Sequence, residues 1–253
     1  MSRADGRPGL LLTARRVVRR FGGVTAVDGV TLTVPPGRIT ALSGPNGAGK
    51  STLFDCLSGA QRPDSGRILL SGRDVTRLPE HLRARLGLAR TFQQSAVFPR
   101  LTVAENLLVG AEQAGRKPPG AASAGVDRAL ALLGLGHVRD HPAGSLPGGT
   151  LRLVELGRAL AAGPGVLLLD EPAAGLDHAE TERLALLLRV LADDGLAVLL
   201  VEHDRDLVDR IADAGYVMAA GRVGPRTAIP GRSDGRPGGR SDGRSDGRPG
   251  HGA

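Results

Sequence analysis

One short motif combines residue types and spacing that suit phosphate chemistry. Residues 44–51, GPNGAGKS, fit the pattern G-x-x-x-x-G-K-[ST] in full. Glycines let consecutive backbone N–H groups turn toward phosphate oxygens, and the positive end of a following helix adds to the attraction. Lys50 is expected to reach the β- and γ-phosphates of a nucleotide, and Ser51 to place its hydroxyl on Mg²⁺. The residues predicted to line the nucleotide are Gly44, Pro45, Asn46, Gly47, Ala48, Gly49, Lys50, Ser51 and Thr52.

The segments on either side decide between a phosphate loop and a glycine-rich turn that contains a lysine by chance. An apolar, strand-like run, RITAL, leads into the motif, and the helical pattern STLFDCLSGA follows it. A phosphate loop requires this order, because the helix must begin where the phosphates bind. The flanking segments therefore favour a nucleotide site.

A second motif, VLLLDEP at residues 166–172, supplies two adjacent carboxylates. Its apolar run predicts a strand, and Asp170 and Glu171 follow at the carboxyl edge of the sheet, where phosphate-loop enzymes hold their metal. We expect Asp170 to hold Mg²⁺, directly or through a water, and Glu171 to act as general base toward the attacking water. Alone, such a pair is more often an ordinary strand end, but together with the phosphate loop it favours catalysis.

Two further polar residues are candidates because of where they stand. His203 follows the apolar run LAVLLV, and neighbouring parallel strands end at the same edge of a sheet, beside the γ-phosphate. A lone histidine at a strand end is equally well explained as a surface or structural residue. Gln93, in ARTFQQSAVFP, is a weaker candidate, because a Gln-Gln pair in a loop is generally just solvated.

Hydrophobic periodicity predicts the elements that hold these residues. Residues 11–42 alternate twice between apolar and polar positions, which predicts strands, and GRILLSGRDVT predicts a further strand pair. A short helix is predicted over residues 79–91, and the region from about 101 to 162 is helical around a Gly/Pro/Ala-rich loop at 115–125. VLLLD and LAVLLVEH are almost wholly apolar and are separated by a helix, which is typical of a parallel sheet covered on both faces.

The predicted fold class is therefore α/β: a phosphate-loop (RecA-like) ATPase core with an N-terminal antiparallel β portion and a helical subdomain at about 93–158. The ATP-binding domain is expected to span residues 10–228. Residues 229–253 form an imperfect Gly-Arg-Ser-Asp-Gly repeat that cannot offset the entropy of ordering, so we predict disorder. A tether, a basic patch for a membrane surface and an artefact of a GC-rich reading frame stay open for this tail.

Composition narrows the classes of protein further. The formal net charge of the 253 residues is +7, and Lys50 and Lys117 are the only lysines among 33 basic residues. A basic chain can bind nucleic acid, but the densest basic segment is the low-complexity tail, so no nucleic-acid partner is expected. The single cysteine, Cys56, excludes an internal disulfide, and its apolar surroundings predict a small buried side chain. No apolar run approaches the ~20 residues of a membrane-spanning helix, and the first residues do not resemble a signal peptide.

In their order along the chain, these motifs resemble those of a known family. Phe21, GPNGAGKST, RTFQ, LPGGT, LLLDEPAAGLD and VEH follow one another, over residues about 10 to 225, as in the ATP-binding subunits of ABC transporters. Within that family, RRFGGVTAVDGV, GLARTFQQSAVFPRLTVAENLLVG and DEPAAGLD are most similar to one of the two paired ATPase subunits of branched-chain amino-acid importers.

The resemblance implies roles for several residues. Phe21 matches the aromatic residue that stacks on adenine, and Gln93 matches the glutamine that contacts Mg²⁺ and senses the membrane partner. His203 matches the switch histidine, and Asp177, in AAGLD, matches a loop that communicates across a dimer. Gln93 and His203 thus join Glu171 as catalytic residues, and Gln93 joins Ser51 and Asp170 as a magnesium ligand.

The family's signature loop departs from its usual form in this chain. In the family ATP is bound between two subunits, and the second subunit contributes a Leu-Ser-Gly-Gly-Gln loop at a helix N-terminus. Here Gly148 and Gly149 match, but Pro147 replaces the serine and Thr150 the glutamine. Proline supplies neither the hydroxyl nor the N–H that serine gives to the γ-phosphate. Each such bond to a charged group is worth about 1.5–3 kcal/mol, so a site that faces this loop should hydrolyse ATP slowly.

A second departure lies near the C-terminal end. The family continues past the switch histidine, often with a Gly-x-Pro turn and a further helix. Gly224 and Pro225 are candidates for an altered turn, whereas the helix is expected to be missing because the repeat begins there.

Taken together, the resemblance implies an ATPase that uses ATP and Mg²⁺ and powers a membrane importer, with hydrolysis that is asymmetric in a heterodimer. The implied partners are a second ATPase subunit, transmembrane permease subunits and, indirectly, a substrate-binding protein. The implied location is the cytoplasmic face of the cell membrane, reached through the permease. Two alternatives stay open: a soluble ATPase of DNA repair or translation, and a regulatory nucleotide-binding protein that is not coupled to transport.

Overall fold

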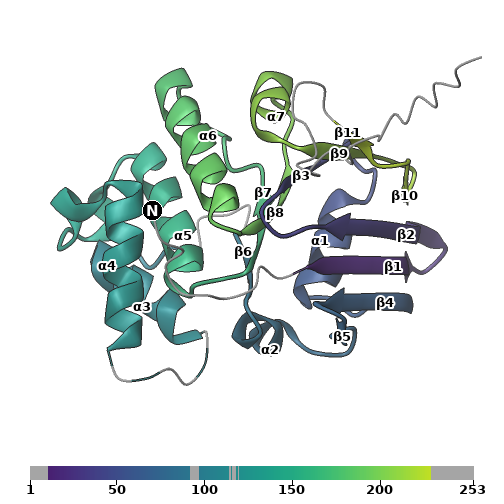
Figure 1. Ribbon diagram of the computed structural model, residues 1–253, viewed down its shortest axis with the longest axis horizontal. Helices are drawn as coiled ribbons and strands as arrows, with labels where there is room; N and C mark the ends of the chain where they lie inside the picture. Colours follow the sequence, from purple (N-terminus) through teal and green to yellow (C-terminus); the bar gives the residue numbers. More distant parts are fainter. Residues whose placement is uncertain (1–10, 92–96, 114, 116–117, 119, 229–253) are drawn as a thin grey trace, which may run out of the picture.

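Two β-sheets form the framework of the protein (Figure 1). The computed structural model describes residues 11–91, 97–113, 115, 118 and 120–228. Strands of the mainly parallel sheet are β3 (Ile39–Ser43), β6 (Leu88–Arg90), β7 (Val166–Asp170), β8 (Ala197–Val201), β9 (Ala214–Ala219), β10 (Arg222–Val223) and β11 (Thr227–Ala228). Strands of the antiparallel sheet are β1 (Leu12–Phe21), β2 (Val24–Val34), β4 (Ser65–Leu70) and β5 (Arg73–Asp74).

The strand order of the mainly parallel sheet makes β3, β8 and β7 neighbours, although they are distant in the sequence. It runs β10-β9-β3-β8-β7-β6, with β11 paired to β9, and the neighbours among β9, β3, β8, β7 and β6 are parallel. The second sheet runs β2-β1-β4-β5. The predicted α/β class, with a parallel core and an N-terminal antiparallel portion, is confirmed.

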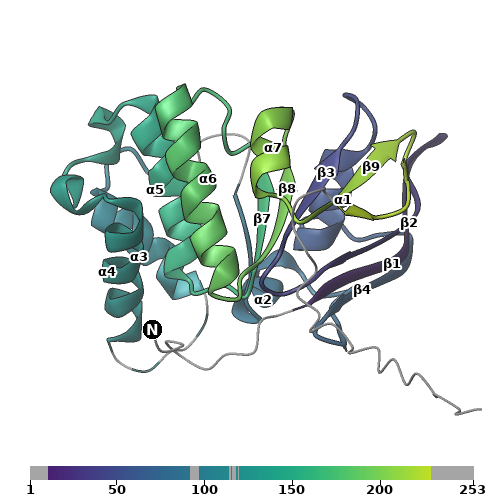
Figure 2. The same cartoon turned by 45° about the horizontal axis from the view of Figure 1, so that its top comes forward.

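The helices cover both faces of the parallel sheet. They are α1 (Lys50–Ser58), α2 (Glu80–Arg85), α3 (Val103–Gln113), α4 (Ala121–Leu133), α5 (Gly148–Ala161), α6 (His178–Asp193) and α7 (Arg205–Ile211). Successive residues of a strand point to opposite faces, so Leu167 of β7 packs in a core shared with α5 and α6, whereas Leu168 packs in a core shared with α1 and the antiparallel sheet. Figure 2 shows α5 and α6 on one side of the sheet and α1 on the other. Every residue of β7 and β8 is buried, which explains their unbroken apolar runs.

Helices α3, α4 and α5 approach closely because glycines stand where they meet. A Cβ on Gly110 of α3 would overlap the carbonyl oxygen of Arg158 in α5, and one on Gly125 of α4 would overlap that of Ala161. Gly125 lies within the loop predicted at 115–125, and that prediction is wrong from Ala121 onward, where α4 begins. The alanines of this stretch favour a helix, and packing against α5 holds it.

The chain over residues 79–91 also differs from the single short helix that was predicted. Helix α2 ends at Arg85, Gly87 turns the chain with a φ of +94°, and Leu88–Arg90 form β6, which pairs with β7. A three-residue strand has too few positions to show a period of two, so pairing with β7 reveals it and the sequence pattern does not. Helix α7 and strands β9 to β11 were likewise not predicted.

Three further expectations concern Cys56, membrane-spanning helices and the C-terminal tail. Cys56 is fully buried, as predicted, and burial raises the pKa of its thiol to about 11. Among the described residues, none of the helices combines the length and apolar character required to cross a lipid bilayer. The predicted disordered tail at 229–253 and Gln93 lie outside the described residues. Of the chain after Pro225, where a helix was expected to be missing, only residues 226–228 are described, and they include β11.

Candidate active site

The phosphate loop turns tightly between β3 and α1 because glycines stand where a side chain would clash. Gly44 has a φ of +149° and Gly49 a φ of +104°. A Cβ at Gly44 would overlap the carbonyl oxygen of Met218 in β9, and one at Gly49 would overlap that of Ala26 in β2. Strands β2 and β9 therefore hold the loop from outside, and only glycine fits at both positions.

Lys50, the first residue of α1, folds back over this loop. Its Nζ donates to the carbonyl oxygens of Gly44, at 2.7 Å, and Pro45, at 3.0 Å, and the residue is 8% exposed. The ammonium group is thus held where a phosphate bound by the loop would meet it. The exposed residues of the motif are Pro45, Asn46, Gly47 and Ser51, whereas Ala48 is buried and Thr52 half-buried.

Asp170, Glu171 and His203 meet at the same sheet edge as the phosphate loop. Strand β8 lies between β3 and β7, and Asp170 at the end of β7 pairs in register with Val201 at the end of β8. His203 Nε2 lies 3.2 Å from Glu171 Oε1, and both side chains are partly exposed. Residues from three separate motifs are therefore brought together by the strand order.

Glu171 leaves β7 with a left-handed backbone conformation. Its φ is +49°, which is uncommon for a residue with a side chain. Its N–H donates to the carbonyl oxygen of Val201 at 2.9 Å, so the turn is tied to β8. Such strain persists only where the surroundings hold it in place, and it is concentrated at functional sites.

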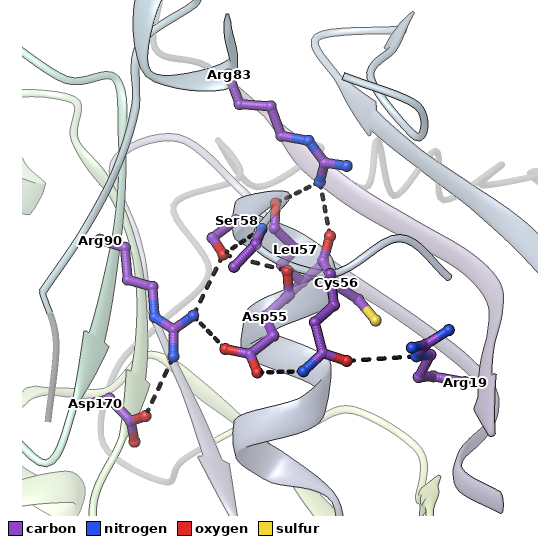
Figure 3. Close-up of polar contacts among 10 residues, drawn as sticks. Arg19, Asp55, Cys56, Leu57, Ser58, Arg83, Arg90 and Asp170 are labelled. Carbon is purple, nitrogen blue, oxygen red and sulfur yellow. Dashed lines mark hydrogen bonds and ion pairs between the residues drawn. The ribbon is translucent and has the colours of Figure 1, made fainter. Parts of the chain in front are cut away.

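Asp170 is 2% exposed, and its charge faces Arg90 at the end of β6 (Figure 3). Arg90 Nη2 lies 3.8 Å from Asp170 Oδ2, and Arg90 Nη1 donates to Asp55 Oδ1 of α1 at 2.6 Å. Burial raises the pKa of the Asp170 carboxyl above its ordinary value, and Arg90 opposes that rise while Glu171 adds to it. Arg90 therefore connects Asp170 with the helix that starts at the phosphate loop.

The residues at this edge suit a magnesium ion. Asp170 Oδ2 is buried and has no hydrogen-bond partner within the described part of the chain, so a hard oxygen donor is available. Over the same residues, no group of three or more His, Cys, Asp or Glu side chains could hold a metal by itself. Magnesium at nucleotide sites takes only one or two protein oxygens together with phosphates and waters, so this donor set fits.

Arg83 of α2 fixes the far end of α1. It is fully buried, and its guanidinium donates to four backbone carbonyls, including those of Cys56 and Leu57 at 2.7 Å each (Figure 3). The last carbonyls of a helix have no partner within it, so Arg83 supplies donors there. Burial lowers the pKa of Arg83 to about 10.

Phe21 lies on the hairpin between β1 and β2, whose second strand meets the phosphate loop at Ala26. Phe21 is 44% exposed, and the guanidinium carbon of Arg19 lies 4.6 Å from the centroid of its ring. The ring of Phe21 is therefore partly accessible at the end of the hairpin that contacts the phosphate loop through Ala26.

The LPGGT segment begins α5, on the opposite face of the sheet from α1 (Figure 2). Pro147 is the N-cap residue, and its carbonyl accepts from the N–H of Leu151 at 3.0 Å. A Cβ at Gly148 would meet nothing within 4 Å, whereas one at Gly149 would overlap the carboxylate of Glu180 in α6. Gly149 thus lies beside α6, whereas Gly148 faces open space, and both stand on the face of the sheet opposite α1.

Asp177 caps helix α6 next to this segment. Its carboxylate accepts from the N–H of Glu180 at 2.7 Å, and Glu180 accepts from the N–H of Asp177 at 3.0 Å. This reciprocal pair is a capping box, which satisfies two otherwise unpaired helix donors. Asp177, Gly148 and Gly149 therefore form one group, separate from the group of Lys50 and Asp170.

Sequence reasoning missed two buried charged residues of this edge, Arg90 and Glu202. Glu202 is 8% exposed and accepts backbone N–H groups from two loops. Arg90 stands three residues before Gln93, and Glu202 directly before His203. In the sequence, both residues are visible only as charged residues at the ends of strands. That pattern does not show whether the side chain is buried.

Comparison with known proteins identifies the family. Residues 27–174 match the ABC transporter family, and this span contains the phosphate loop, Asp170 and Glu171. The chain belongs to the ABC transporter family. The cassette is 40% identical over 226 residues to the high-affinity branched-chain amino acid transport ATP-binding protein LivG of Escherichia coli K12, an alignment that covers 83% of this chain and 89% of LivG.

Two other similarities bear on the fold and the cargo. The cassette is 36% identical over 214 residues to the lipopolysaccharide export system ATP-binding protein LptB of Haemophilus influenzae, covering 84% of this chain and 88% of LptB. It also resembles the ADP conformation of MJ1267, an ATP-binding cassette of an ABC transporter, with a TM-score of 0.78 and 33% identity over 87% of this chain and 91% of that one. The cassette is thus an ABC-type ATPase. Because LivG and LptB are named for unlike cargoes, family membership alone does not define what is transported.

Proposed function

We propose that this cassette hydrolyses ATP to power a membrane importer for branched-chain or related amino acids. The observation that carries the proposal is the meeting of Lys50, Asp170, Glu171 and His203 at one sheet edge. The similarity to LivG, together with the sequence around Gln93, supports the class of cargo. The proposed ATP-binding domain is residues 10–228, with its helical part at about 93–158.

Each residue at the edge has a proposed part in hydrolysis. Lys50 binds the β- and γ-phosphates, and Ser51, Asp170 and Gln93 hold Mg²⁺, which supplies charge neutralisation to the phosphates when bound. Glu171 is the general base toward water. His203, at 3.2 Å from Glu171, orients that carboxylate and contacts the γ-phosphate.

The adenine ring is proposed to stack on Phe21. Arg19 lies against that ring and Ala26 holds the adjoining strand against Gly49, so the hairpin is anchored to the phosphate loop. Stacking on an exposed aromatic ring needs no rearrangement of the buried core.

Dimerisation is proposed because Gly148, Gly149 and Asp177 lie away from the phosphate loop of their own chain. In a dimer that binds ATP between two subunits, this group would face the phosphates of the partner. Pro147 leaves that face with fewer donors, so the partner's ATP would be hydrolysed slowly. A heterodimer with one complete site is therefore the proposed assembly.

The permease is proposed to dock in a groove whose lining includes the end of β6. A cavity of about 450 Å³ lies between α2, β6, α3 and α5, and its lining includes Arg90 and Thr91, the last described residues before Gln93. A permease segment in this groove would contact the end of β6 directly. Through it the cassette would be held at the cytoplasmic face of the membrane, with a substrate-binding protein delivering cargo to the permease.

The rate of ATP hydrolysis by the isolated protein tests the signature loop. Pro147 is exposed and has a φ of −58° and a ψ of 154°, a conformation that serine adopts freely. Pro147→Ser combined with Thr150→Gln should therefore fold normally and hydrolyse ATP at least about tenfold faster, since one bond to a charged group is worth about 1.5–3 kcal/mol. Glu171→Gln is the inactive control. Equal rates for the unaltered and double-substituted homodimers would refute the role of this loop.

Reconstitution tests coupling and cargo. The cassette should raise uptake of radiolabelled leucine into vesicles that contain a candidate permease and binding protein, and Glu171→Gln should abolish that uptake. A regulatory protein or a soluble ATPase would bind or hydrolyse ATP but would co-purify with no permease. Capture of a membrane permease on the immobilised cassette separates these classes.

A further inference from the structure

We propose that Glu202 is a positioning residue that holds the loops of Glu171 and His203 in a single arrangement. This inference rests on the proposed roles of Glu171 and His203, because Glu202 would affect hydrolysis only through the loops that carry them. It adds to the site a residue that acts through the backbone of the two loops.

The contacts of Glu202 join two loops that are distant in sequence. Its Oε1 accepts from the N–H of Ala173, two residues after Glu171, at 3.0 Å. Its Oε2 accepts from the N–H of His203 at 2.8 Å and, at 3.4 Å, from that of Asp204. One carboxylate therefore ties the loop that follows β7 to the loop that follows β8.

The chemistry of Glu202 is unusual for a buried acid. The residue is 8% exposed, and no arginine, lysine or histidine of the described residues forms an ion pair with it. Burial of a charge is costly unless hydrogen bonds compensate for it, and here backbone N–H groups do so. Both oxygens are needed, because each serves a different loop.

This arrangement bears directly on the pair above it. Glu171 Oε1 lies 3.2 Å from His203 Nε2, and Glu171 has a strained φ of +49°. Its N–H is tied to Val201, the residue before Glu202. Strain of this kind needs support from neighbouring structure. Glu202 supplies that support through its hydrogen bonds to the N–H groups of Ala173, in the loop of Glu171, and of His203.

Two substitutions separate the two acceptor oxygens. In Glu202→Gln one oxygen becomes an amide nitrogen, which cannot accept a hydrogen bond, so one loop loses its link. In Glu202→Met both links are lost while the side chain keeps a similar size. We expect kcat for ATP hydrolysis to fall roughly tenfold in Glu202→Gln and further in Glu202→Met. Affinity for the probe trinitrophenyl-ATP should change less than about twofold, because Lys50 and its loop are untouched.

Asp213→Asn is the matched control. Asp213 is a buried carboxylate that also accepts a backbone N–H, that of Ile39 at 2.8 Å. It directly precedes β9 and lies beside the first residue of β3, at the opposite end of these strands from the site. Its loss should lower the melting temperature and leave kcat unchanged. A merely structural Glu202 would behave in the same way, so equal effects on kcat from Asp213→Asn and Glu202→Gln would overturn the proposal.

Amide hydrogen exchange gives a readout that does not depend on ATP hydrolysis. The N–H groups of Ala173 and His203 should be protected in the unaltered protein. At least one of them should lose protection in Glu202→Gln, and both in Glu202→Met, while amides of β3 stay protected. Unchanged protection at both positions would overturn the proposal.

A double-substitution cycle tests the pathway. If Glu202 acts through the Glu171–His203 pair, Glu202→Gln should lower kcat much less in a His203→Ala background than in the unaltered protein. Losses that simply multiply would overturn the inference. Wild-type rates for Glu171→Gln and His203→Ala alone would instead refute the proposed function, and amide exchange would then still decide whether Glu202 holds the loops.

Discussion

Arg90→Met tests whether one buried guanidinium holds the candidate metal ligand and the phosphate-loop helix together. The Arg90 side chain is 8% exposed and lies between Asp55 at 2.6 Å and Asp170 at 3.8 Å (Figure 3). Methionine retains the packing against Phe54, whose ring centroid is 5.9 Å from the guanidinium carbon, but carries no charge. The substitution therefore removes the two ion pairs together with the hydrogen bond that Arg90 Nη1 donates to Ser58 Oγ at 3.3 Å.

The expected loss follows from burial. Asp170 is 2% exposed and would be left buried without its cation, while Asp55, at 27%, could recover part of its hydration. Removing one partner of a buried pair typically costs roughly 3–5 kcal/mol. For a domain of this size each kcal/mol lowers the melting temperature by about 2–4 °C, so the expected fall is roughly 6–20 °C.

Thermal unfolding in the presence of EDTA and without nucleotide measures this loss. Arg139→Met is the matched control, because Arg139 and Asp127 form an ion pair at 2.7 Å whose side chains are 47% and 59% exposed. That pair is solvated, so its removal should change the melting temperature little. Arg90→Lys should lie between Arg90→Met and the unaltered protein, because an ammonium group cannot bridge both carboxylates as the planar guanidinium does.

Salt provides the discriminating condition. A buried pair is only weakly screened, so the difference between Arg90→Met and the unaltered protein should persist in 1 M NaCl, where the Debye length is about 3 Å. A melting temperature for Arg90→Met that equals that of Arg139→Met would refute the reasoning. So would a difference that disappears at high salt.

Buried contacts elsewhere give three shorter tests. Asp213→Asn should lower the free energy of unfolding by roughly 1–3 kcal/mol at neutral pH. Burial acts to raise the pKa of Asp213, but its hydrogen bonds to a backbone N–H and two arginines hold that pKa below its ordinary value. Its ionised form therefore stabilises the fold above the unfolded-state pKa, and urea titrations should show the gap to the unaltered protein closing as the pH falls through the folded-state pKa. Cys56, fully buried with a pKa of about 11, should resist a thiol reagent until the protein unfolds, and rapid labelling of the folded protein would contradict this. Gly149→Ala should unfold at lower urea than Gly148→Ala, because only the former displaces Glu180 from its capping box, and equal midpoints would show that the box yields freely.

Much of the fold could be predicted because its signals are local. The apolar runs of β7 and β8 stand out since both faces of these strands are buried, and α6 between them has an ordinary helical period. Predictions failed where the signal was short or depended on packing. Strand β6 has only three residues, and α4 begins four residues before Gly125, within a stretch that reads as a loop until α5 is seen against it.

The sequence by itself determined where the phosphate-loop motif and the Asp170–Glu171 pair lie, because each is a contiguous motif that can be recognised from its residue types. Tertiary structure alone decided which residues surround them. The strand order places β7 between β8 and β6, so His203 after β8 reaches Glu171 and Arg90 at the end of β6 reaches Asp170. Glu202 joins the loops that follow β7 and β8. A charged residue at a strand end reads the same in sequence whether it faces water or a buried partner. Only the packing of neighbouring strands excludes water from such a side chain and fixes which groups its charge contacts.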